Sequence, residues 1–188
     1  MENIKQQLSD VIHHWTAIAM ITLFLFPVQP VYALPALPEE TVKTEYQLKQ
    51  ETLQRLSTEK YTAKQQLTDE DLIALLKGVG FEGTGLKTAW AIAKRESNGR
   101  PLAYNGNRST GDSSYGIFQI NMIDGLGIDR LELFNEKFDV KTKTELFDPV
   151  TNAEITYYMT NGGQDWSSWK GLTPKAKEWY MLFPNKLQ

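Results

Sequence analysis

Beyond residue 14 the chain contains neither histidine nor cysteine, and this double absence constrains its fold more than any other feature. Both histidines, His13 and His14, lie near the amino end, and cysteine is absent from the whole sequence. The body of the protein therefore has no disulfides and no zinc site built on thiolate or imidazole ligands. It must fold on its hydrophobic core alone, and 188 residues with 41% apolar content are enough for one such core.

The same absence limits the chemistry that the protein can perform. Catalytic schemes of the Ser-His-Asp and Cys-His types cannot be assembled in the body of the chain, which leaves carboxylates, hydroxyls, amines and amides. The 20 basic and 23 acidic residues give a net charge of −3, so no general basic field attracts nucleic acid. The acidic residues are scattered along the sequence and lack the spacing of a metal-binding motif. We therefore expect no nucleic-acid partner, no metal and no cofactor.

The amino terminus carries the pattern of an export signal. Residues 15–28, WTAIAMITLFLFPV, are uncharged but fewer than the roughly 20 residues that a helix needs to cross a bilayer. Val31-Tyr32-Ala33 offers small side chains to a signal peptidase, although the residues before the run have no net positive charge. We predict that residues 1–33 are a signal peptide or, alternatively, an uncleaved membrane anchor, with membrane association through residues 15–31.

Residues 34–67 are predicted to be a charged helical linker. Between Pro38 and Gln66 the apolar residues form only a narrow stripe, and three acid–base pairs stand four residues apart, which supports an exposed helix. A coiled-coil or partner-binding helix is the alternative, but the apolar seam covers fewer than three heptads. We expect a solvated spacer before the folded domain, and we expect the protein to be a monomer.

A folded domain is predicted over residues 68–172, followed by a short helix and tail over residues 173–188. Thr68 is a good N-cap, three acids follow it, and Gly80 closes this first helix. The predicted fold class of the domain is α+β, mainly α. We assign Trp166 and Trp169 to packing near the end of the domain, with stacking on a sugar ring as the alternative.

Two further helices and a hairpin complete the predicted domain. The second helix follows Thr84-Gly85 and contains LKTAWAIAKRES. The third begins at Asp148-Pro149, where Asp is the N-cap and Pro the first helical residue, and ends at Asn161-Gly162-Gly163. Between them a loop rich in Gly, Ser, Asn and Asp leads into Tyr115–Asn121, whose alternation predicts a short hairpin strand with a polar face.

Glu96, in the last turn of the second helix, is the candidate catalytic residue. On a helical wheel it shares a stripe about 100° wide with Ile92 and Ala93, so its carboxyl group lies on the apolar face. Apolar surroundings raise the pKa of a carboxylic acid and keep it protonated near neutrality, as a general acid that cleaves a glycosidic bond requires. The alternative is a solvated residue at a helix end, or an ion-pair partner of Lys94 or Arg95.

These residues, taken in order, resemble the lysozyme-like superfamily, and within it the lytic transglycosylases of the soluble (SLT) type. The resemblance spans roughly residues 72–169. It consists of Ala93-Lys94-Arg95-Glu96-Ser97-Asn98, of SSYGIFQIN at residues 113–121, of Asp148-Pro149 with Asn152, and of Trp166 and Trp169. Glu-Ser followed by Gly-Ile-Phe-Gln-Ile-Asn is specific in combination. The resemblance implies a lysozyme-like fold with a small β-hairpin lobe, a sugar-binding groove and peptidoglycan as the partner.

The resemblance also implies a role for individual residues. Glu96 would protonate the oxygen that links N-acetylmuramic acid to N-acetylglucosamine, and its carboxylate would then take a proton from the muramoyl 6-hydroxyl to give a 1,6-anhydro sugar. Gln119 and Asn121 could equally be strand residues that face water, and Tyr157 a core aromatic. The candidate substrate-binding residues are Ser114, Tyr115, Gln119, Asn121 and Tyr157. Such a protein would act in the periplasm, the cell envelope or the extracellular space, or on a virion if its source is a phage.

The sequence departs from c-type lysozymes at one important position. Those enzymes place a second carboxylate immediately before the Tyr-Gly of the hairpin, where this chain has Ser114. Asp112 lies two residues earlier and could face the same side of a strand. A single acid fits transglycosylation, so we predict that reaction. A lysozyme-type hydrolase and a non-catalytic peptidoglycan-binding or structural protein remain as alternatives.

Overall fold

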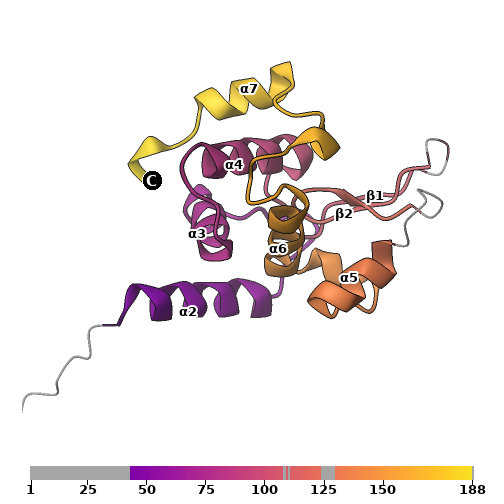
Figure 1. Cartoon of the computed structure of the whole chain (residues 1–188), viewed down its shortest axis with the longest axis horizontal. Helices are drawn as coiled ribbons and strands as arrows, with labels where there is room; N and C mark the ends of the chain where they lie inside the picture. Colours follow the sequence, from indigo (N-terminus) through magenta and orange to yellow (C-terminus); the bar gives the residue numbers. More distant parts are fainter. Residues whose placement is uncertain (1–42, 108, 110, 124–129, 188) are drawn as a thin grey trace, which may run out of the picture. The chain divides into compact units, whose positions relative to one another are not determined.

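Figure 1 shows the computed structural model, which describes residues 43–107, 109, 111–123 and 130–187. The predicted export signal at residues 1–33 and the beginning of the predicted linker lie outside these ranges. Within them, no helix combines the length and the apolar character that a membrane span requires. The described residues belong to one unit that begins at Lys43.

The described chain is mostly helical and carries one small antiparallel sheet, which confirms the predicted α+β, mainly α class. The sheet has the order β1-β2-β3, with Tyr104 opposite Tyr115 and Ser114 opposite Asn121. The elements are α2 (Glu45–Thr58), α3 (Asp69–Val79), α4 (Gly83–Ser97), β1 (Tyr104–Asn105), β2 (Ser114–Tyr115), β3 (Ile120–Asn121), α5 (Arg130–Phe138), η1 (Lys143–Phe147), α6 (Pro149–Met159), η2 (Ser167–Trp169), α7 (Pro174–Met181) and η3 (Asn185–Leu187).

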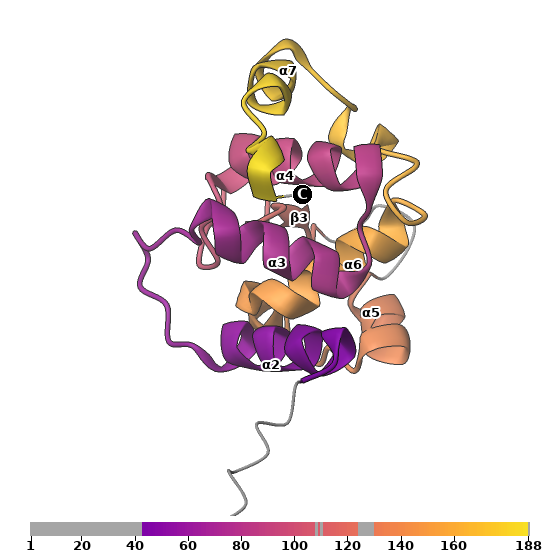
Figure 2. The same ribbon diagram turned by 90° about the vertical axis from the view of Figure 1, so that its left-hand side faces the viewer.

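Helix α2 packs against the domain, whereas the sequence predicts a solvated linker here. Leu56 is fully buried, Leu53 packs against the core, and Arg55 forms an ion pair with Asp71 of α3. Figures 1 and 2 show α2 running beneath α3 and α6, both of which it contacts. The narrow apolar stripe of α2 is sufficient for this packing, because only one face of the helix contacts the domain. The folded unit is therefore larger than the predicted residues 68–172.

Helix α4 lies at the centre of the core. Its Trp90 is buried and meets the ring of Trp179 at 6.0 Å and the ring of Phe183 at 5.5 Å, both edge-on. Helix α7 therefore packs along α4, and Figure 2 shows the two helices one above the other. The predicted C-terminal helix and tail belong to the same core as the domain before them.

The helix ends follow the predicted caps. The Thr68 hydroxyl accepts a hydrogen bond from the Asp71 amide at 3.0 Å, and Gly80 ends α3 with φ +121°. Asp148 accepts a bond from the Thr151 amide at 2.7 Å at the start of α6, with proline as the first helical residue. Each cap satisfies backbone groups that a helix end would otherwise leave unpaired.

Asn152 of α6 joins the sheet region to the helices. Its side chain is fully buried, accepts a hydrogen bond from the Phe118 amide at 2.9 Å, and donates to the carbonyls of Tyr115 at 3.0 Å and Leu146 at 2.9 Å. Gly116 has φ +75°, and a Cβ there would collide with Asn152 and with the Leu146 carbonyl. Glycine is therefore required where the hairpin passes this helix.

The segment predicted as one hairpin strand, Tyr115–Asn121, instead contains the end of β2, a turn over residues 116–119, and β3. Gln119 has φ +50°, and both Ile117 and Phe118 are fully buried, so the alternation of faces does not continue. Backbone groups in this turn hydrogen-bond to side chains instead. The Phe118 amide donates to Asn152, and the Ile117 carbonyl accepts from the Ser97 hydroxyl at 2.7 Å. These side chains replace the ladder bonds that a longer strand would make.

Candidate active site

An open cavity of about 450 Å³ lies where the end of α4 meets the sheet region. One part of its lining is Arg95 and Glu96 at the end of α4. Another comes from residues between 112 and 121, which are polar except for Ile120, and the rest from Arg130, Met159 and the segment 168–173. Because its walls come from several distant parts of the sequence, only the folded chain creates this cleft.

Glu96 lines the cleft, and its side chain is 26% exposed. The stripe beside it is buried as the helical wheel predicts, with Ile92 and Ala93 at 0% exposure. The carboxylate itself, however, is held by a cation: its Oε1 accepts hydrogen bonds from Nε of Arg95 at 2.9 Å and from Nη2 of the same group. The predicted apolar enclosure of the carboxyl group is thus replaced by the alternative ion pair with Arg95. Among the described residues, no donor contacts Oε2.

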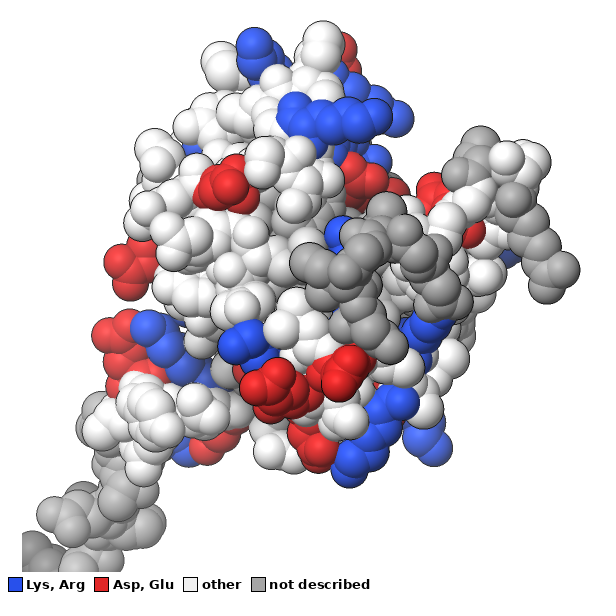
Figure 3. Space-filling model, turned by 45° about the vertical axis from the view of Figure 1, so that its right-hand side comes forward, with Lys and Arg blue, Asp and Glu red and all other residues white. Residues whose placement is uncertain are grey.

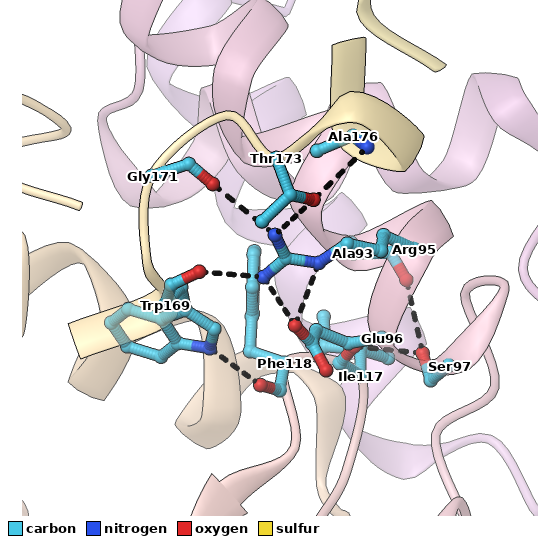
Figure 4. Close-up of polar contacts among 10 residues, drawn as sticks. All are labelled: Ala93, Arg95, Glu96, Ser97, Ile117, Phe118, Trp169, Gly171, Thr173 and Ala176. Atoms are coloured by element: carbon cyan, nitrogen blue, oxygen red, sulfur yellow. Dashed lines mark hydrogen bonds and ion pairs between the residues drawn. The ribbon is translucent and has the colours of Figure 1, made fainter. Parts of the chain in front are cut away.

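Arg95 links Glu96 through hydrogen bonds to residues 169–173, at the end of η2 and just after it. Its guanidinium donates to the carbonyl of Trp169 at 2.9 Å, to the carbonyl of Gly171 at 3.2 Å and to the Thr173 hydroxyl at 3.1 Å, as Figure 4 shows. The Arg95 side chain is only 11% exposed. The planar guanidinium fork thus fixes the direction of the carboxylate and closes one wall of the cleft at the same time.

We expect Arg95→Met to lower the free energy of unfolding by about 2 kcal/mol, because the carbonyls of Trp169 and Gly171 and the Glu96 carboxylate lose charge-assisted donors. If Glu96 is the catalytic acid that the sequence predicts, catalytic activity should fall as well, since Glu96 loses its orientation. Thermal unfolding and turnover of the same preparation measure both effects. Lys177→Met, at an exposed position of α7, is the control. Equal stability of the two variants would contradict this role of Arg95.

Ser97, which follows the candidate acid Glu96, links the end of α4 to the sheet region. It is buried at 2% exposure, donates to the Ile117 carbonyl at 2.7 Å and accepts from the Gly99 amide at 3.1 Å. The hydroxyl thus joins the carboxyl end of α4 to the turn between β2 and β3, as Figure 4 shows for its bond to Ile117. The Glu-Ser pair sets the position of Glu96 relative to the hairpin.

Asp112 lines the same cleft as Glu96. One of its carboxylate oxygens accepts from the Ser114 hydroxyl at 2.5 Å and the other from the Asn105 amide group at 2.6 Å. Asp112 and Ser114 therefore face the same side, as alternation along a strand predicts. The cleft holds two carboxylates, one from α4 and one from the sheet region, although the position before Tyr115 is a serine.

Three of the predicted substrate-binding residues line the cleft: Ser114, Gln119 and Asn121. Gln119 uses its amide nitrogen to donate to the carbonyls of Ala103 and Gly116, both at 3.0 Å. The Asn121 side-chain oxygen accepts from the Ile123 amide at 3.0 Å. Both side chains therefore shape the hairpin backbone as well as the cleft surface.

The two predicted tyrosine contacts lie elsewhere. Tyr115 packs between Tyr104 and Phe147, with ring centroids 5.0 and 5.3 Å away. Tyr157 meets Phe81 edge-on at 5.0 Å and lines a separate cavity. Neither tyrosine lines the cleft, so for Tyr157 the structure supports the alternative of a core aromatic. Helix α6 instead brings Met159 to the cleft, because its turns place Tyr157 on a different face.

The tryptophans mainly pack the core, as predicted. Trp166 and Trp169 are each 8% exposed, and their indole groups donate to the carbonyls of Gly163 at 3.0 Å and Phe118 at 2.8 Å. Trp169 also contributes to the cleft lining. Arg130 is a cleft residue that the sequence did not predict, and it donates to the Asn121 carbonyl. No local pattern marks it, because it meets the cleft only through the fold.

Comparison with known proteins finds a sequence similarity to lysozyme-like domains. The model of a family described as "Lysozyme like domain" matches residues 73–171, which include α4, the sheet and η2. The milk isozyme of lysozyme C from the dog, Canis lupus familiaris, is 48% identical over 42 residues, which are 22% of this chain and 33% of that lysozyme. The chain thus matches about a third of the lysozyme's length. No solved structure matches the chain.

Proposed function

The chain belongs to the family of lysozyme-like domains, and from this premise we propose that it cleaves the glycan strands of peptidoglycan. The bond would be the β-1,4 link between N-acetylmuramic acid and N-acetylglucosamine. The single observation that supports this proposal best is the position of Glu96, which lines an open polar cleft at the end of α4.

The reaction that we propose is lytic transglycosylation, with Glu96 as acid and then as base. Arg95 holds Oε1, so Oε2 carries the proton to the glycosidic oxygen as the bond from that oxygen to the muramoyl C1 breaks. The carboxylate then takes the proton of the muramoyl 6-hydroxyl, whose oxygen bonds to C1. Water is not consumed, and the product is a 1,6-anhydro sugar. One acid that donates and then accepts a proton is sufficient for both steps.

Asp112 supports a second candidate, hydrolysis of the same bond. Retaining glycosidases use a second carboxylate as nucleophile, and inverting ones use it to activate water. Asp112 lines the same cleft as Glu96 and is a candidate for either role. Its two oxygens already accept hydrogen bonds from Ser114 and Asn105, which favours a structural role. We therefore keep transglycosylation as the proposed reaction.

The products of the reaction test this choice. Purified peptidoglycan sacculi would be digested with the full-length protein, and the released muropeptides would be weighed by mass spectrometry. Transglycosylation yields anhydro-muramic products, each lighter by one water than the hydrolytic product with its reducing end. Reducing ends alone would assign the protein to the hydrolases, and no released muropeptides would contradict glycan cleavage altogether.

Asp112→Asn separates the two reactions further. The amide keeps an oxygen for the Ser114 hydroxyl, and the change costs only the exposed hydrogen bond from the Asn105 amide group. The new amide cannot act as nucleophile or base. If Glu96 works alone, the rate of muropeptide release should stay within about threefold of wild type, whereas loss of a second catalytic carboxylate costs about a hundredfold or more. Asp165→Asn, an exposed acid outside the cleft, is the matched control. A hundredfold loss in Asp112→Asn alone would favour hydrolysis.

The proposed substrate lies outside the cytoplasm. We therefore propose that the protein is exported to the periplasm, the cell envelope or the extracellular space, or is carried by a virion if its source is a phage. The apolar run at residues 15–28 and the small residues at 31 and 33 support this proposal.

A further inference from the structure

A second cavity, of about 560 Å³, adjoins the cleft at Glu96. The two cavities share Arg95 and Glu96. The second one continues along the end of α4 to Arg100, and its other walls come from the segment before α3 and from α7. Its lining includes five cationic side chains, those of Lys64, Lys94, Arg95, Arg100 and Lys175, and we call it the basic cavity.

The basic cavity concentrates positive charge on a chain whose net charge is −3. Glu96 is the one acidic side chain that lines it among the described residues. In Figure 3, Lys and Arg side chains gather at the upper end of the molecule, over α7. Since the chain as a whole is acidic, the basic cavity is a local feature, and a local cluster of one sign is suited to a ligand of the opposite sign.

Two of the five cations are already paired. Arg95 is bonded to Glu96, and Lys94 forms an ion pair with Asp69 at 3.1 Å. Within the described part of the chain, no acidic side chain pairs with Lys64, Arg100 or Lys175, and all three are exposed. These three side chains therefore keep their charge for a ligand.

We propose that the basic cavity binds carboxylate groups on a branch of the substrate, beside the sugar held at Glu96. The inference rests on the proposed function and specifies its substrate. A glycan in the cleft passes Glu96, where a branch on the sugar at the scissile bond can enter the basic cavity. In peptidoglycan the muramic acid at the scissile bond carries such a branch, a stem peptide with free carboxylates. Charge-assisted bonds from Lys64, Arg100 and Lys175 match that chemistry.

The test measures binding separately from cleavage. Full-length Glu96→Gln protein would be titrated with soluble peptidoglycan strands that keep their free stem carboxylates, and with the same strands after those carboxyls are converted to amides. The amidated strands should bind about tenfold more weakly, and the difference should shrink as salt is added. Equal affinity for the two kinds of strand would overturn the proposal.

A pair of charge-matched double variants assigns the effect to the basic cavity. Lys64→Gln with Lys175→Gln, made in the Glu96→Gln protein, should weaken binding of the free-carboxylate strands about threefold to tenfold and leave the amidated strands unchanged. Lys60→Gln with Lys177→Gln removes the same charge from exposed positions that do not line this cavity. Equal losses in the two double variants would contradict the assignment.

The outcomes also separate this inference from the proposed function. If the wild-type protein releases muropeptides but the Glu96→Gln protein binds both kinds of strand equally, cleavage stands and the carboxylate site is wrong. If binding discriminates between the strands but no muropeptide is released, the carboxylate site stands and the proposed cleavage fails.

Discussion

Glu96→Gln should lower the rate of muropeptide release by about a thousandfold or more, because an amide can neither donate the first proton nor accept the second. The change keeps the shape of the side chain, and its carbonyl oxygen can still accept from Arg95. Thermal stability should therefore stay within about 1 kcal/mol of wild type, since only a partly exposed ion pair is altered. Release of muropeptides from sacculi, followed over time, is the measurement.

The control for this variant is Glu178→Gln, which removes the same charge from an exposed position on α7. It should cleave at the wild-type rate. If Glu96→Gln also cleaved at that rate, Glu96 would not be the catalytic acid, and the proposed mechanism would fail for transglycosylation and hydrolysis alike. A large loss in Glu96→Gln with an unchanged unfolding transition would assign the loss to chemistry.

Asn152→Ala should lower the free energy of unfolding by about 3 kcal/mol or more. The substitution leaves the Phe118 amide and the carbonyls of Tyr115 and Leu146 without their buried partner, and it opens a hole in a closed core. For a chain of this size the melting temperature should fall by about 10 °C. Scanning calorimetry or circular dichroism would measure it.

Asn135→Ala, at an exposed position in α5, is the control and should unfold like the wild type. Asn152→Asp refines the test. It keeps an oxygen that can accept from the Phe118 amide, but it turns another oxygen toward two carbonyls, so we expect a loss comparable to that of alanine. If Asn152→Ala unfolded at the temperature of the Asn135 control, the bonds from α6 to the hairpin would not hold this region together.

Part of the cleft lining could be predicted from the sequence. Glu96, Ser114, Gln119 and Asn121 all line the cleft, whereas Tyr115 and Tyr157 do not. Glu96 lies on the apolar stripe that the period of its helix predicts. Ser114, Gln119 and Asn121 were predicted from the resemblance to the lysozyme-like superfamily, since the predicted alternation of faces over residues 115–121 does not continue in the structure. Tyr157 could not be placed in this way, because the period of α6 says which residues share a face, but not which of its faces meets the cleft.

The sequence by itself determined the features that depend on neighbours along the chain. Thr68 and Asp148 cap helices through backbone groups three residues away, and the stripe of α4 carries Glu96. The absence of histidine and cysteine after residue 14 restricts the chemistry of the folded body to groups such as carboxylates. These conclusions rest on local geometry and on which side chains exist, and they do not depend on how distant parts of the chain pack.

Only the tertiary structure decided which distant groups meet. It placed α2 on the core, brought Asp112 into the cleft of Glu96, and attached Arg95 to the carbonyls of residues 169 and 171. It also gathered Lys64 and Lys175 around one cavity although 111 positions separate them in the chain. Such pairings come from the packing of whole helices against each other, and a local pattern shows a face without showing what covers it.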